Sequence, residues 1–585
     1  MTLAAGTVPA PAAFLPPTLM DLFKLALDHR ISLTELHLLQ VRLGHKPPSA
    51  SDIADPIADE VAVKLLDLLR LPEFGVVGFG PSNFKAFGPA MPPQPLAPIT
   101  FIFGPNSSGK SSLLHSLLWG QHAATTGELD VIRPELSGNN VNLGGFQTFR
   151  HKRSADSVSL GFTVCLPKRY TLDSTEATAR LSLDYSLESK GVSNARPVLR
   201  TFTLEVSDHE MLRASRRPNG KMQVDRASVV NASRLSAFMA ESDQDFFSFA
   251  NVVSELVDQL SFDGDGLLPS SSNRGQITQV GHEKKVINLA SDFLQHIEAL
   301  VLDACAIVRD WFDQIAYLGP IRTYPDRTWS FSDYRDADWK AGGGDAWEAI
   351  RDIANVRDYV NRFLVSTGYI FRVKNYIAET EAKEAVENYL TIKPVVDGYS
   401  EEQKEAIAKG REEEEGFDFD RFSLNRTFRH RDLVLVDIRN RIEVSARDVG
   451  VGISQLVPVV AMAYGLERKT ILMEQPEIHV HPKLQADLGD VFIESSLREA
   501  LMGNRYIIET HSETLILRVL RRIRETKLGK VNPCYAATAE DVAIYYVEPT
   551  KEGSILRRIR IDDTGRMIDR VPGGFFEDNF AEMFA

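Results

Sequence analysis

Eight consecutive residues in the first fifth of the chain have the types and spacing to hold a phosphate group. The stretch "GPNSSGKS", from Gly104 to Ser111, fits the phosphate-loop pattern G-x-x-x-x-G-K-[ST]. Its glycines allow close backbone approach, and successive N–H groups at a helix start can donate to phosphate oxygens. Lys110 can neutralise β- and γ-phosphates, and Ser111 can ligate Mg²⁺. The stretch predicts a nucleoside triphosphate site.

Two later segments place functional side chains at the ends of predicted strands. In "KTILMEQPEIHVHPKLQ", an apolar strand at 471–473 delivers Glu474, a carboxylate that can hold Mg²⁺ directly or through water. In "RYIIETHSETLIL", a strand at 506–508 delivers Glu509 and His511. Open α/β sheets bind ligands at the carboxyl ends of their strands. We therefore expect both tips to meet the loop at one sheet edge.

The elements around the loop follow from its apolar flanks. Residues 99–103 predict a buried strand and residues 112–119 a helix. A strand-rich region continues to about residue 207, after which 226–262 and 283–315 are predicted to be helical. The acidic segment 376–415 is predicted to be a solvated helical face.

Composition favours a globular protein of two or more subdomains. The 585 residues are 43% hydrophobic and 25% charged, and no apolar run approaches the roughly 20 residues of a membrane span. The N-terminus lacks the pattern of a secretory signal, and the three cysteines lie far apart, so we expect a cytoplasmic protein with reduced thiols. A net charge of −14 excludes a uniformly basic surface but leaves room for a local basic groove.

The expected fold class is α/β, a phosphate-loop NTPase built from four parts. These are an N-terminal helical extension (1–75), a strand-rich lobe with the loop (76–210), a helical insertion (211–310) and a second lobe (311–585). Part of the extension faintly resembles a winged helix-turn-helix, although it shows no basic recognition helix.

The order of these motifs resembles an ABC-type ATPase head. The nearest resemblance is to the bacterial head-only, OLD-like ATPases of the AAA family, which are related to SMC proteins. Four further stretches fit: "NFKAFG", "VNLGGFQTFRHKR", "YLGPIRTYPDR" and "ARDVGVGISQLVPVV". The ending "DRVPGGFFEDNFAEMF" resembles the W-P-x-G-F-F tail of one uncharacterised bacterial branch. The resemblance covers about residues 76–585.

The resemblance implies ATP and Mg²⁺ as cofactors and assigns roles to individual positions. It implies that Gln147 lies between Mg²⁺ and the attacking water, that Glu474 is the Mg²⁺-associated carboxylate, and that His511 senses the γ-phosphate. The phosphate-binding positions are Gly104, Pro105, Asn106, Ser107, Ser108, Gly109, Lys110, Ser111 and Ser112. The signature segment, with Gly450, Gly452 and the nearby Ser454, would cap the γ-phosphate of an opposing protomer, so the expected state is a homodimer or higher homo-oligomer.

One position departs from the family pattern. Gln475 stands where a catalytic glutamate normally activates water, and an amide can orient water but cannot accept its proton. Either hydrolysis is slow and ATP clamps the dimer, or Glu477 serves as the base. Glu-Gln-Pro-Glu is common in the branch with this tail, so the amide does not by itself imply an inactive enzyme.

Two further groups of residues have open interpretations. His479 and His481 beside Glu477 could ligate a metal, but we favour a structural loop. Clustered basic side chains could line a path for nucleic acid, although a solvated face is the default for each. They are Arg322, Arg213, Arg216, Arg217, Lys221, Arg426, Arg429, Arg431, Arg518, Arg521, Arg522 and Arg524.

The leading functional hypothesis is an ATP-hydrolysing, dimeric switch that acts in anti-phage defence or another DNA-associated process. The 74 residues after His511 lack the acidic set of a TOPRIM-type nuclease, so a separately encoded effector, such as a nuclease, is the expected partner. The alternative is a scaffold that binds ATP without turnover. A phosphoryl-transfer kinase is less favoured because it gives the signature glycines and the switch histidine no purpose.

Overall fold

The structure is a computed structural model. It describes residues 75–89, 91–153, 156–166, 178–189, 195–206, 209–230, 245–271, 283–323, 338–376, 430–444, 449–497 and 503–571. The predicted N-terminal helical extension, nearly all of the acidic 376–415 segment and most of the C-terminal tail lie outside these ranges.

A six-stranded sheet carries the predicted phosphate loop and both predicted strand tips. Five neighbouring strands are parallel and the last pair is antiparallel. The strand order is β11 (Ile315–Leu318), β15 (Thr470–Glu474), β16 (Arg505–Glu509), β3 (Ile99–Phe103), β17 (Val542–Glu548) and β18 (Ile555–Ile559). The predicted strands at 99–103, 471–473 and 506–508 are therefore confirmed.

This sheet is covered on both faces, which explains why its strands are almost wholly apolar. Every residue of β3 is buried. Ile99, Phe101 and Phe103 belong to one hydrophobic core, whereas Ile102 points to the other. The first core packs against α10 (Gly344–Asp352), α11 (Ala354–Leu364), α14 (Val451–Gly465), α15 (Pro482–Leu497) and α17 (Glu513–Lys527).

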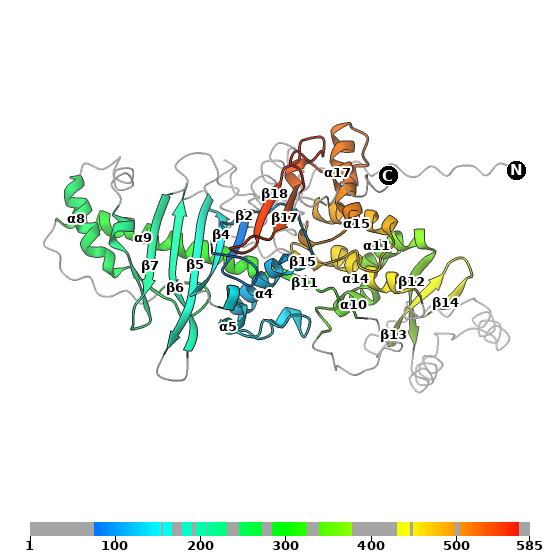
Figure 1. Cartoon of the computed structure of the whole chain (residues 1–585), viewed down its shortest axis with the longest axis horizontal. Helices are drawn as coiled ribbons and strands as arrows, with labels where there is room; N and C mark the ends of the chain where they lie inside the picture. Colours follow the sequence, from blue (N-terminus) through cyan, green and yellow to red (C-terminus); the bar gives the residue numbers. More distant parts are fainter. Residues whose placement is uncertain are drawn as a thin grey trace, which may run out of the picture.

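The second core joins the parallel sheet to a nine-stranded sheet through α4 (Lys110–Thr126) and α9 (Lys284–Asp313). Figure 1 shows the nine-stranded sheet on one side of the molecule and helices α10, α11, α14 and α15 on the other, with α4 between them. Its order is β10 (Ser270–Ser271), β9 (Ser261–Asp263), β8 (Lys221–Val224), β7 (His209–Arg216), β6 (Ala195–Val206), β5 (Thr178–Ser189), β4 (Ser157–Cys165), β1 (Val76–Ser82) and β2 (Gln94–Pro95). All its described pairings are antiparallel.

The predicted helical insertion is only partly helical. Residues 211–224 extend the antiparallel sheet as β7 and β8, because Leu212 and Ala214 are buried while Arg213 between them is exposed, an alternation typical of strands. The predicted helix at 226–262 contains α6 (Arg226–Val229), α8 (Phe246–Leu256) and the short strand β9. The predicted helix at 283–315 is confirmed as α9, whose buried stripe includes Val286, Phe293 and Ile297.

The remaining elements are small. A three-stranded antiparallel sheet contains β12 (Tyr369–Tyr376), β13 (His430–Asp437) and β14 (Ile442–Val444). A short helix, α5 (Phe146–Phe149), lies between α4 and β4 in the sequence. The 3-10 turns are Glu135–Ser137, His151–Arg153, Val257–Gln259, Val365–Thr367, Pro533–Tyr535 and Ala539–Asp541. None of the helices within the described ranges has the length and apolar character needed to cross a membrane.

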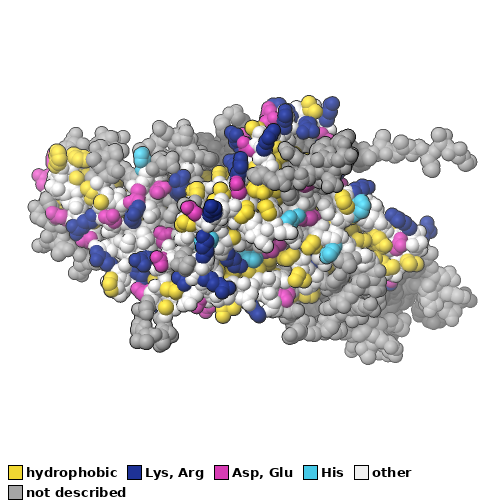
Figure 2. Space-filling view, in the orientation of Figure 1, with side chains coloured by type: hydrophobic (Ala, Val, Ile, Leu, Met, Phe, Trp, Pro, Cys, Tyr) yellow, Lys and Arg dark blue, Asp and Glu magenta, His cyan; other side chains and the backbone are white. Residues whose placement is uncertain are grey.

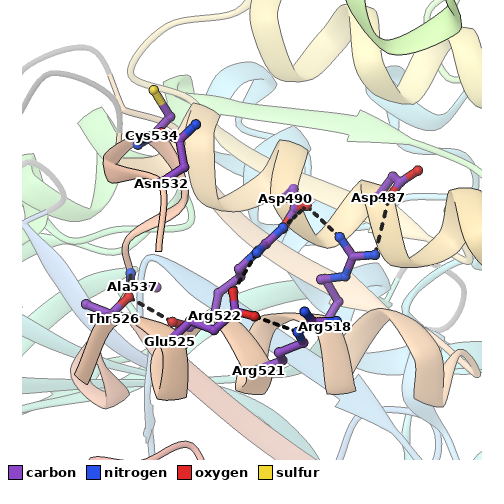
Figure 3. A network of polar contacts seen from close by, with 10 residues as sticks. All are labelled: Asp487, Asp490, Arg518, Arg521, Arg522, Glu525, Thr526, Asn532, Cys534 and Ala537. Carbon is purple, nitrogen blue, oxygen red and sulfur yellow. Dashed lines mark hydrogen bonds and ion pairs between the residues drawn. The ribbon is translucent and has the colours of Figure 1, made fainter. Parts of the chain in front are cut away.

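A network of ion pairs clamps α15 to α17 (Figure 3). Arg518 Nη1 donates to Asp490 Oδ2 at 2.7 Å, and Arg522 makes two bonds to the same carboxylate, each of 2.7 Å. Arg522 Nη1 also donates to Glu525 at 2.6 Å. These arginines lie on the polar face of α17 predicted as a candidate nucleic-acid contact. Their cationic groups are engaged within the chain instead.

Basic side chains of the antiparallel sheet are also paired. Arg213 bonds Glu210, and Arg216 contacts Glu188 and Asp265. Figure 2 shows Lys and Arg side chains interspersed with Asp and Glu over this half of the visible face. The mixed signs do not favour a groove for nucleic acid on this part of the described surface.

Candidate functional site

The turn after β3 has the backbone shape that the phosphate-loop pattern predicts. Gly104, Ser107 and Gly109 all have positive φ, at 148°, 61° and 102°, before α4 begins at Lys110. A Cβ on Gly109 would lie 2.4 Å from the Cβ of Ala86, so only glycine fits this close approach. The N-terminus of α4 therefore opens directly onto the turn.

The Lys110 side chain lies inside the turn. It is 4% exposed, and its Nζ donates to the carbonyl oxygens of Gly104 at 3.2 Å and Pro105 at 2.9 Å. Burial lowers the pKa of Lys110, while the charges of Glu509 and Glu477 act in the opposite direction. A cation held within a loop of backbone amides is suited to binding a polyphosphate.

A cleft of about 410 Å³ joins the phosphate loop to the tips of β15 and β16. It is lined by Lys85, Ala86, Asn106, Ser107, Gly109, Lys110, Ser111, Ser112, His115, Gln475, Glu509 and His511. The structure thus brings the three predicted segments to one sheet edge. Lys85 and His115 were not predicted as site residues, and Glu509 was placed at a strand tip without a role.

Glu509 ends the strand next to the phosphate-loop strand. Its backbone is paired with Ile102 of β3, and the residue is 4% exposed. Burial and, second, the charge of Glu474 raise the pKa of Glu509 to about 7, although a hydrogen bond from Ser111 and the charge of Lys110 oppose the shift. Its Oε2 has no hydrogen-bond partner in the part of the chain that the structure describes. A buried carboxylate oxygen left without a donor calls for a functional explanation.

Glu474 is occupied by contacts within the chain. Its Oε1 accepts a hydrogen bond of 2.9 Å from the Tyr317 hydroxyl and lies 3.2 Å from His115 Nε2. The other imidazole nitrogen, Nδ1, lies 2.8 Å from Lys85 Nζ. Because a lysine ammonium can only donate, Nδ1 is the acceptor and Nε2–H faces the carboxylate. Glu474 is not among the residues that line the cleft.

Burial is the main cause of the pKa shifts of His115 and Lys85. Burial lowers the pKa of His115, against a hydrogen bond with Glu474, so the imidazole is neutral at neutral pH. Burial also lowers the pKa of Lys85 to about 8, against the attraction of Glu474. Lys85 comes from "NFKAFG", where the only sequence signal was its position ahead of the loop.

The residues after Glu474 adopt a constrained turn. Gln475 has a φ of 46° and lines the cleft, and its N–H donates to the Glu509 carbonyl at 2.8 Å. Glu477 is 8% exposed, and its Oε1 accepts a 2.6 Å bond from the His511 N–H. Burial raises the pKa of Glu477, opposed first by that hydrogen bond. Glu477 positions His511 and does not line the cleft, so its predicted role as base receives no support from this geometry.

His511 itself lines the cleft, as predicted for a residue that senses the ligand. Burial, followed by the charge of Lys110, lowers the pKa of His511, so the imidazole is neutral at neutral pH. A neutral imidazole beside a buried lysine can donate one hydrogen bond and accept another.

Arg322 lies beneath the cleft. It is 3% exposed, and its guanidinium donates to three carbonyl oxygens: those of Gln455 (3.0 Å), Glu474 (3.3 Å) and Gln475 (3.0 Å). Burial lowers the pKa of Arg322 to about 10, against the charge of Glu477. Arg322 is therefore a buried structural cation, so the default expectation that it lies on a solvated face is wrong, and its buried position does not suit the alternative of a nucleic-acid contact.

The remaining predicted binding positions lie away from the cleft of this chain. Gln147 is exposed on α5 and does not line the cleft. Gly450 is exposed at the N-terminus of α14, and no atom of the described residues lies within 4 Å of the position of an added Cβ. Gly452 packs against the His479 carbonyl, and Ser454 is 1% exposed. Their predicted roles in nucleotide contact stay predictions.

The His-x-His segment has a local structural role at one position. His479 and His481 are exposed, and His481 Nδ1 accepts a 3.2 Å bond from the Lys483 N–H at the start of α15. Within the described residues, no group of three or more His, Cys, Asp or Glu side chains is arranged to hold a metal ion on its own.

Comparisons with known families match two parts of the chain. Residues 356–516 match the family described as AAA ATPase domain, and residues 538–585 match the family described as Protein of unknown function (DUF3696). The first match includes Glu474, Gln475 and His511 but not the phosphate loop, which the fold brings to them. No curated protein matches the chain.

Three solved structures align with 83% of this chain at 10% identity. One is the SMC head domain from Thermotoga maritima, with 99% of that chain covered and a TM-score of 0.31. Another is the Smc head domain with an extended coiled coil, bound to the C-terminal domain of ScpA, from Pyrococcus furiosus (96%, 0.32). The third is the recombination mediator protein RecF-ATPrS of the RecFOR pathway (97%, 0.25).

The fold assignment rests on the family match together with the sheet order and loop geometry of this chain. A parallel sheet with a glycine-rich loop between its central strand and a helix is the arrangement expected for nucleotide binding at a strand edge. The chain has the α/β fold of a P-loop ATPase, and its residues 356–516 are similar to the AAA ATPase domain family.

Proposed function

We propose that the chain binds ATP with Mg²⁺ in the cleft and hydrolyses it. The observation that carries this proposal is the meeting of Lys110, Glu509 and His511 around one cleft of about 410 Å³. The site fits the ligand because Glu509 Oε2, a buried oxygen of a cleft-lining residue, has no hydrogen-bond partner among the described residues, and the same holds for Ser108 Oγ of the phosphate loop. Bound Mg²⁺ would supply positive charge that stabilises the transferring phosphoryl group.

Individual residues have distinct proposed tasks. Lys110 and Lys85 supply positive charge to the phosphates, and the Ser111 hydroxyl holds Mg²⁺ together with a carboxylate at the tip of β15 or β16. Gln475 orients water without accepting its proton. These assignments predict slow hydrolysis, because no glutamate occupies position 475.

Nucleotide binding tests the core of the proposal. Lys110→Ala should weaken binding of a fluorescent ATP analogue by about 30- to 150-fold, the equivalent of losing a charge-assisted contact of about 2–3 kcal/mol. Lys152→Ala is the matched control, because Lys152 is exposed and its Nζ bonds only the Lys551 carbonyl at 3.1 Å among the described contacts. Equal affinities of wild type and Lys110→Ala would contradict the proposal.

Phosphate release separates the ATPase from the alternative, a scaffold that binds ATP without turnover. Wild type should release phosphate slowly, and Lys110→Ala should release none above background. Gln475→Glu should raise the rate, since it adds a proton acceptor at a cleft-lining position. ATP binding without any release by wild type, and no gain in Gln475→Glu, would favour the scaffold.

We also propose that ATP closes a homodimer or higher homo-oligomer. Support comes from Gly450, which leaves the N-terminus of the 15-residue helix α14 exposed and uncrowded. Gly450→Arg has room to fold and should abolish ATP-dependent association in analytical ultracentrifugation while leaving nucleotide binding by the monomer measurable. Association of the variant equal to that of wild type would refute this surface.

The biological setting we propose is anti-phage defence or another DNA-associated process, with a separately encoded effector such as a nuclease. Its support is the family resemblance of the motifs, not a contact in the structure. Copurification of an effector with the tagged chain, dependent on Lys110 and ATP, is the expected result. Nucleic acid is a weaker candidate, because many of the described basic side chains proposed for it are paired with acids or buried.

A further inference from the structure

We propose that Ser554 is a positioning residue of the phosphate loop, and that its hydroxyl holds one peptide unit of the loop with the N–H group facing the phosphates. This inference rests on the proposed function, since it concerns how the loop receives a nucleotide. It follows from a hydrogen bond behind the loop, from the geometry of the peptide that this bond holds, and from the close approach of the hairpin that carries Ser554.

The hairpin that carries Ser554 lies next to the strand of the phosphate loop. β17 pairs in parallel with β3, and its antiparallel partner β18 begins one residue after Ser554 (Figure 1). Ser554 is 6% exposed and does not line the cleft. Its Oγ donates to the carbonyl oxygen of Ser108 at 2.5 Å, and its N–H donates to the carbonyl oxygen of Ala86 at 2.7 Å. One residue therefore binds both the phosphate loop and the segment that contributes Lys85 and Ala86 to the cleft.

The hydrogen bond to Ser108 fixes the direction of the next N–H group. The peptide bond between Ser108 and Gly109 is trans, so its C=O and N–H point in opposite directions. Because the C=O is directed at Ser554 behind the loop, the Gly109 N–H is directed away from the hairpin, and Gly109 lines the cleft. Within the described residues this N–H donates to no acceptor, so it is available to a phosphate oxygen.

This peptide needs an outside contact to keep its direction. Gly109 has a φ of 102°, and glycine accepts both signs of φ, so its backbone does not by itself prevent the peptide from turning over. A turned peptide would present the Ser108 carbonyl oxygen to the phosphates, and its partial negative charge would repel them. The Ser554 hydroxyl disfavours that orientation. Its hydrogen bond also polarises the peptide, which strengthens the Gly109 N–H as a donor.

Two glycines permit the hairpin to come this close. Gly553 has a φ of 135°, and a Cβ added to it would lie 2.4 Å from the backbone nitrogen of Gly88. A Cβ added to Gly88 would lie 2.4 Å from the carbonyl oxygen of Glu552. A side chain at either glycine would push the turn between β17 and β18 away from Gly88 and would move Ser554 with it. The turn is therefore built to bring Ser554 against the site.

Binding of the fluorescent ATP analogue mant-ATP and of inorganic pyrophosphate tests the role of the hydroxyl. Pyrophosphate has no base or sugar, so its affinity, measured by displacement of mant-ATP, reports the phosphate contacts alone. Ser554→Ala should weaken the binding of both ligands by about 5- to 20-fold, because one hydrogen bond to a charged group is no longer held in place. Ser554→Thr keeps a hydroxyl donor and should stay within about threefold of the wild-type affinities.

Tyr545→Phe is the matched control. The Tyr545 hydroxyl donates to the carbonyl oxygen of Pro95 at 2.6 Å, so this variant also removes a hydroxyl-to-carbonyl bond from the same hairpin. Neither Tyr545 nor Pro95 lines the cleft. The midpoint of thermal unfolding without nucleotide should fall by similar amounts in Tyr545→Phe and Ser554→Ala. Only Ser554→Ala should lose affinity for mant-ATP and pyrophosphate, whereas a purely structural role of Ser554 predicts the same affinities in both variants.

The outcomes separate this inference from the function on which it rests. Wild-type affinities in Ser554→Ala overturn the positioning role, and so does a loss of affinity that is equally large in Ser554→Thr. An equal loss in Tyr545→Phe overturns it too, because the effect would then follow from general destabilisation of the hairpin. A wild-type protein that binds neither mant-ATP nor pyrophosphate overturns the proposed function and this inference together.

Discussion

Charged side chains are arranged differently at the tips of β15 and β16 and on the helices α15 and α17 that follow them. Glu477 in the loop after β15 and Glu509 at the last position of β16 each keep one buried oxygen that has no hydrogen-bond donor among the described residues. In the helices, Asp490 of α15 accepts three hydrogen bonds from Arg518 and Arg522 of α17, all of 2.7 Å. The strand tips thus carry carboxylates with incomplete hydrogen bonding, whereas the helices carry a carboxylate that is fully paired with arginines.

This difference indicates that the ion pairs between α15 and α17 stabilise the fold, whereas the strand tips are suited to binding a ligand. Paired side chains on α15 and α17 fix the helices relative to each other, and through them the strand tips. The buried Glu477, Glu509 and Lys110 bring charged groups close together, and a bound metal ion and phosphates can neutralise these charges. Substitutions in the two regions should therefore differ in size and in sign.

The largest effect is expected at Arg322, the buried cation under the cleft. Arg322→Met should lower the free energy of unfolding by about 3–5 kcal/mol, because three carbonyl oxygens lose a charged donor and the buried Glu477 carboxylate loses the attraction of a nearby cation. Urea denaturation followed by tryptophan fluorescence measures it. Arg357→Met is the control: Arg357 bonds two carbonyls but no carboxylate in the described structure, so a loss of about 1 kcal/mol is expected. Equal losses would contradict this explanation.

Lys85 should show the opposite sign, because the cleft disfavours its charge. Its pKa is lowered from 10.5 to about 8, so below pH 8 both states are protonated and the folded state carries the penalty. Wild-type stability should rise between about pH 8 and 10.5, where only the folded state has released the proton. At pH 7, Lys85→Met should be more stable by about 2 kcal/mol, a value reduced for partial exposure.

The pH dependence of that difference is the decisive measurement. The advantage of Lys85→Met should shrink toward zero by about pH 10, as followed by urea denaturation across the range. The groups that face Lys85 are His115, whose pKa is lowered by burial, and Glu474. A difference that does not change with pH would show that packing, not charge, explains the variant.

A smaller loss is expected in the helix network. Asp490→Asn should lower the free energy of unfolding by about 1 kcal/mol, because Arg518 keeps Asp487 and Arg522 keeps Glu525 as partners. The midpoint of thermal unfolding, followed by circular dichroism, measures it. A change above about 3 kcal/mol would show that Asp490 acts as a buried and not a partly exposed ion.

The smallest effect belongs to Glu525, which pairs along its own helix with Arg521 and Arg522, each at 2.6 Å. Glu525→Gln should cost about 0.3 kcal/mol at pH 7. The side-chain hydrogen bonds from Arg521 and Arg522 lower the pKa of Glu525, so this contribution is present above its ordinary pKa and disappears as pH falls below it. An effect that grows at acid pH would contradict the pairing.

Local patterns predicted the phosphate loop and its strands because each depends on residues close in sequence. β3, β15 and β16 are short apolar runs that end at a polar residue, and the loop has fixed glycine spacing. β7 and β8 were missed because each alternates over only a few residues and gains its partners from β6 and β9.

Contacts between distant residues could not be predicted in the same way. The pair between His115 and Glu474 spans more than 350 positions, and nothing in either local sequence pattern indicates it. The prediction for Arg322 failed for the same reason, since its three carbonyl acceptors lie more than 130 residues along the chain. Residue type set what each side chain could do, and tertiary packing decided which of those contacts it made.

The guanidinium of Arg322 has a mechanical consequence. Its hydrogen bonds connect the second turn of α14, at the Gln455 carbonyl, to the end of β15, at the carbonyls of Glu474 and Gln475. We expect that a displacement of the end of β15 also displaces the start of α14, because one rigid, planar guanidinium donates hydrogen bonds to both. A shift in the position of residue 475 should therefore also shift the exposed N-terminal end of α14.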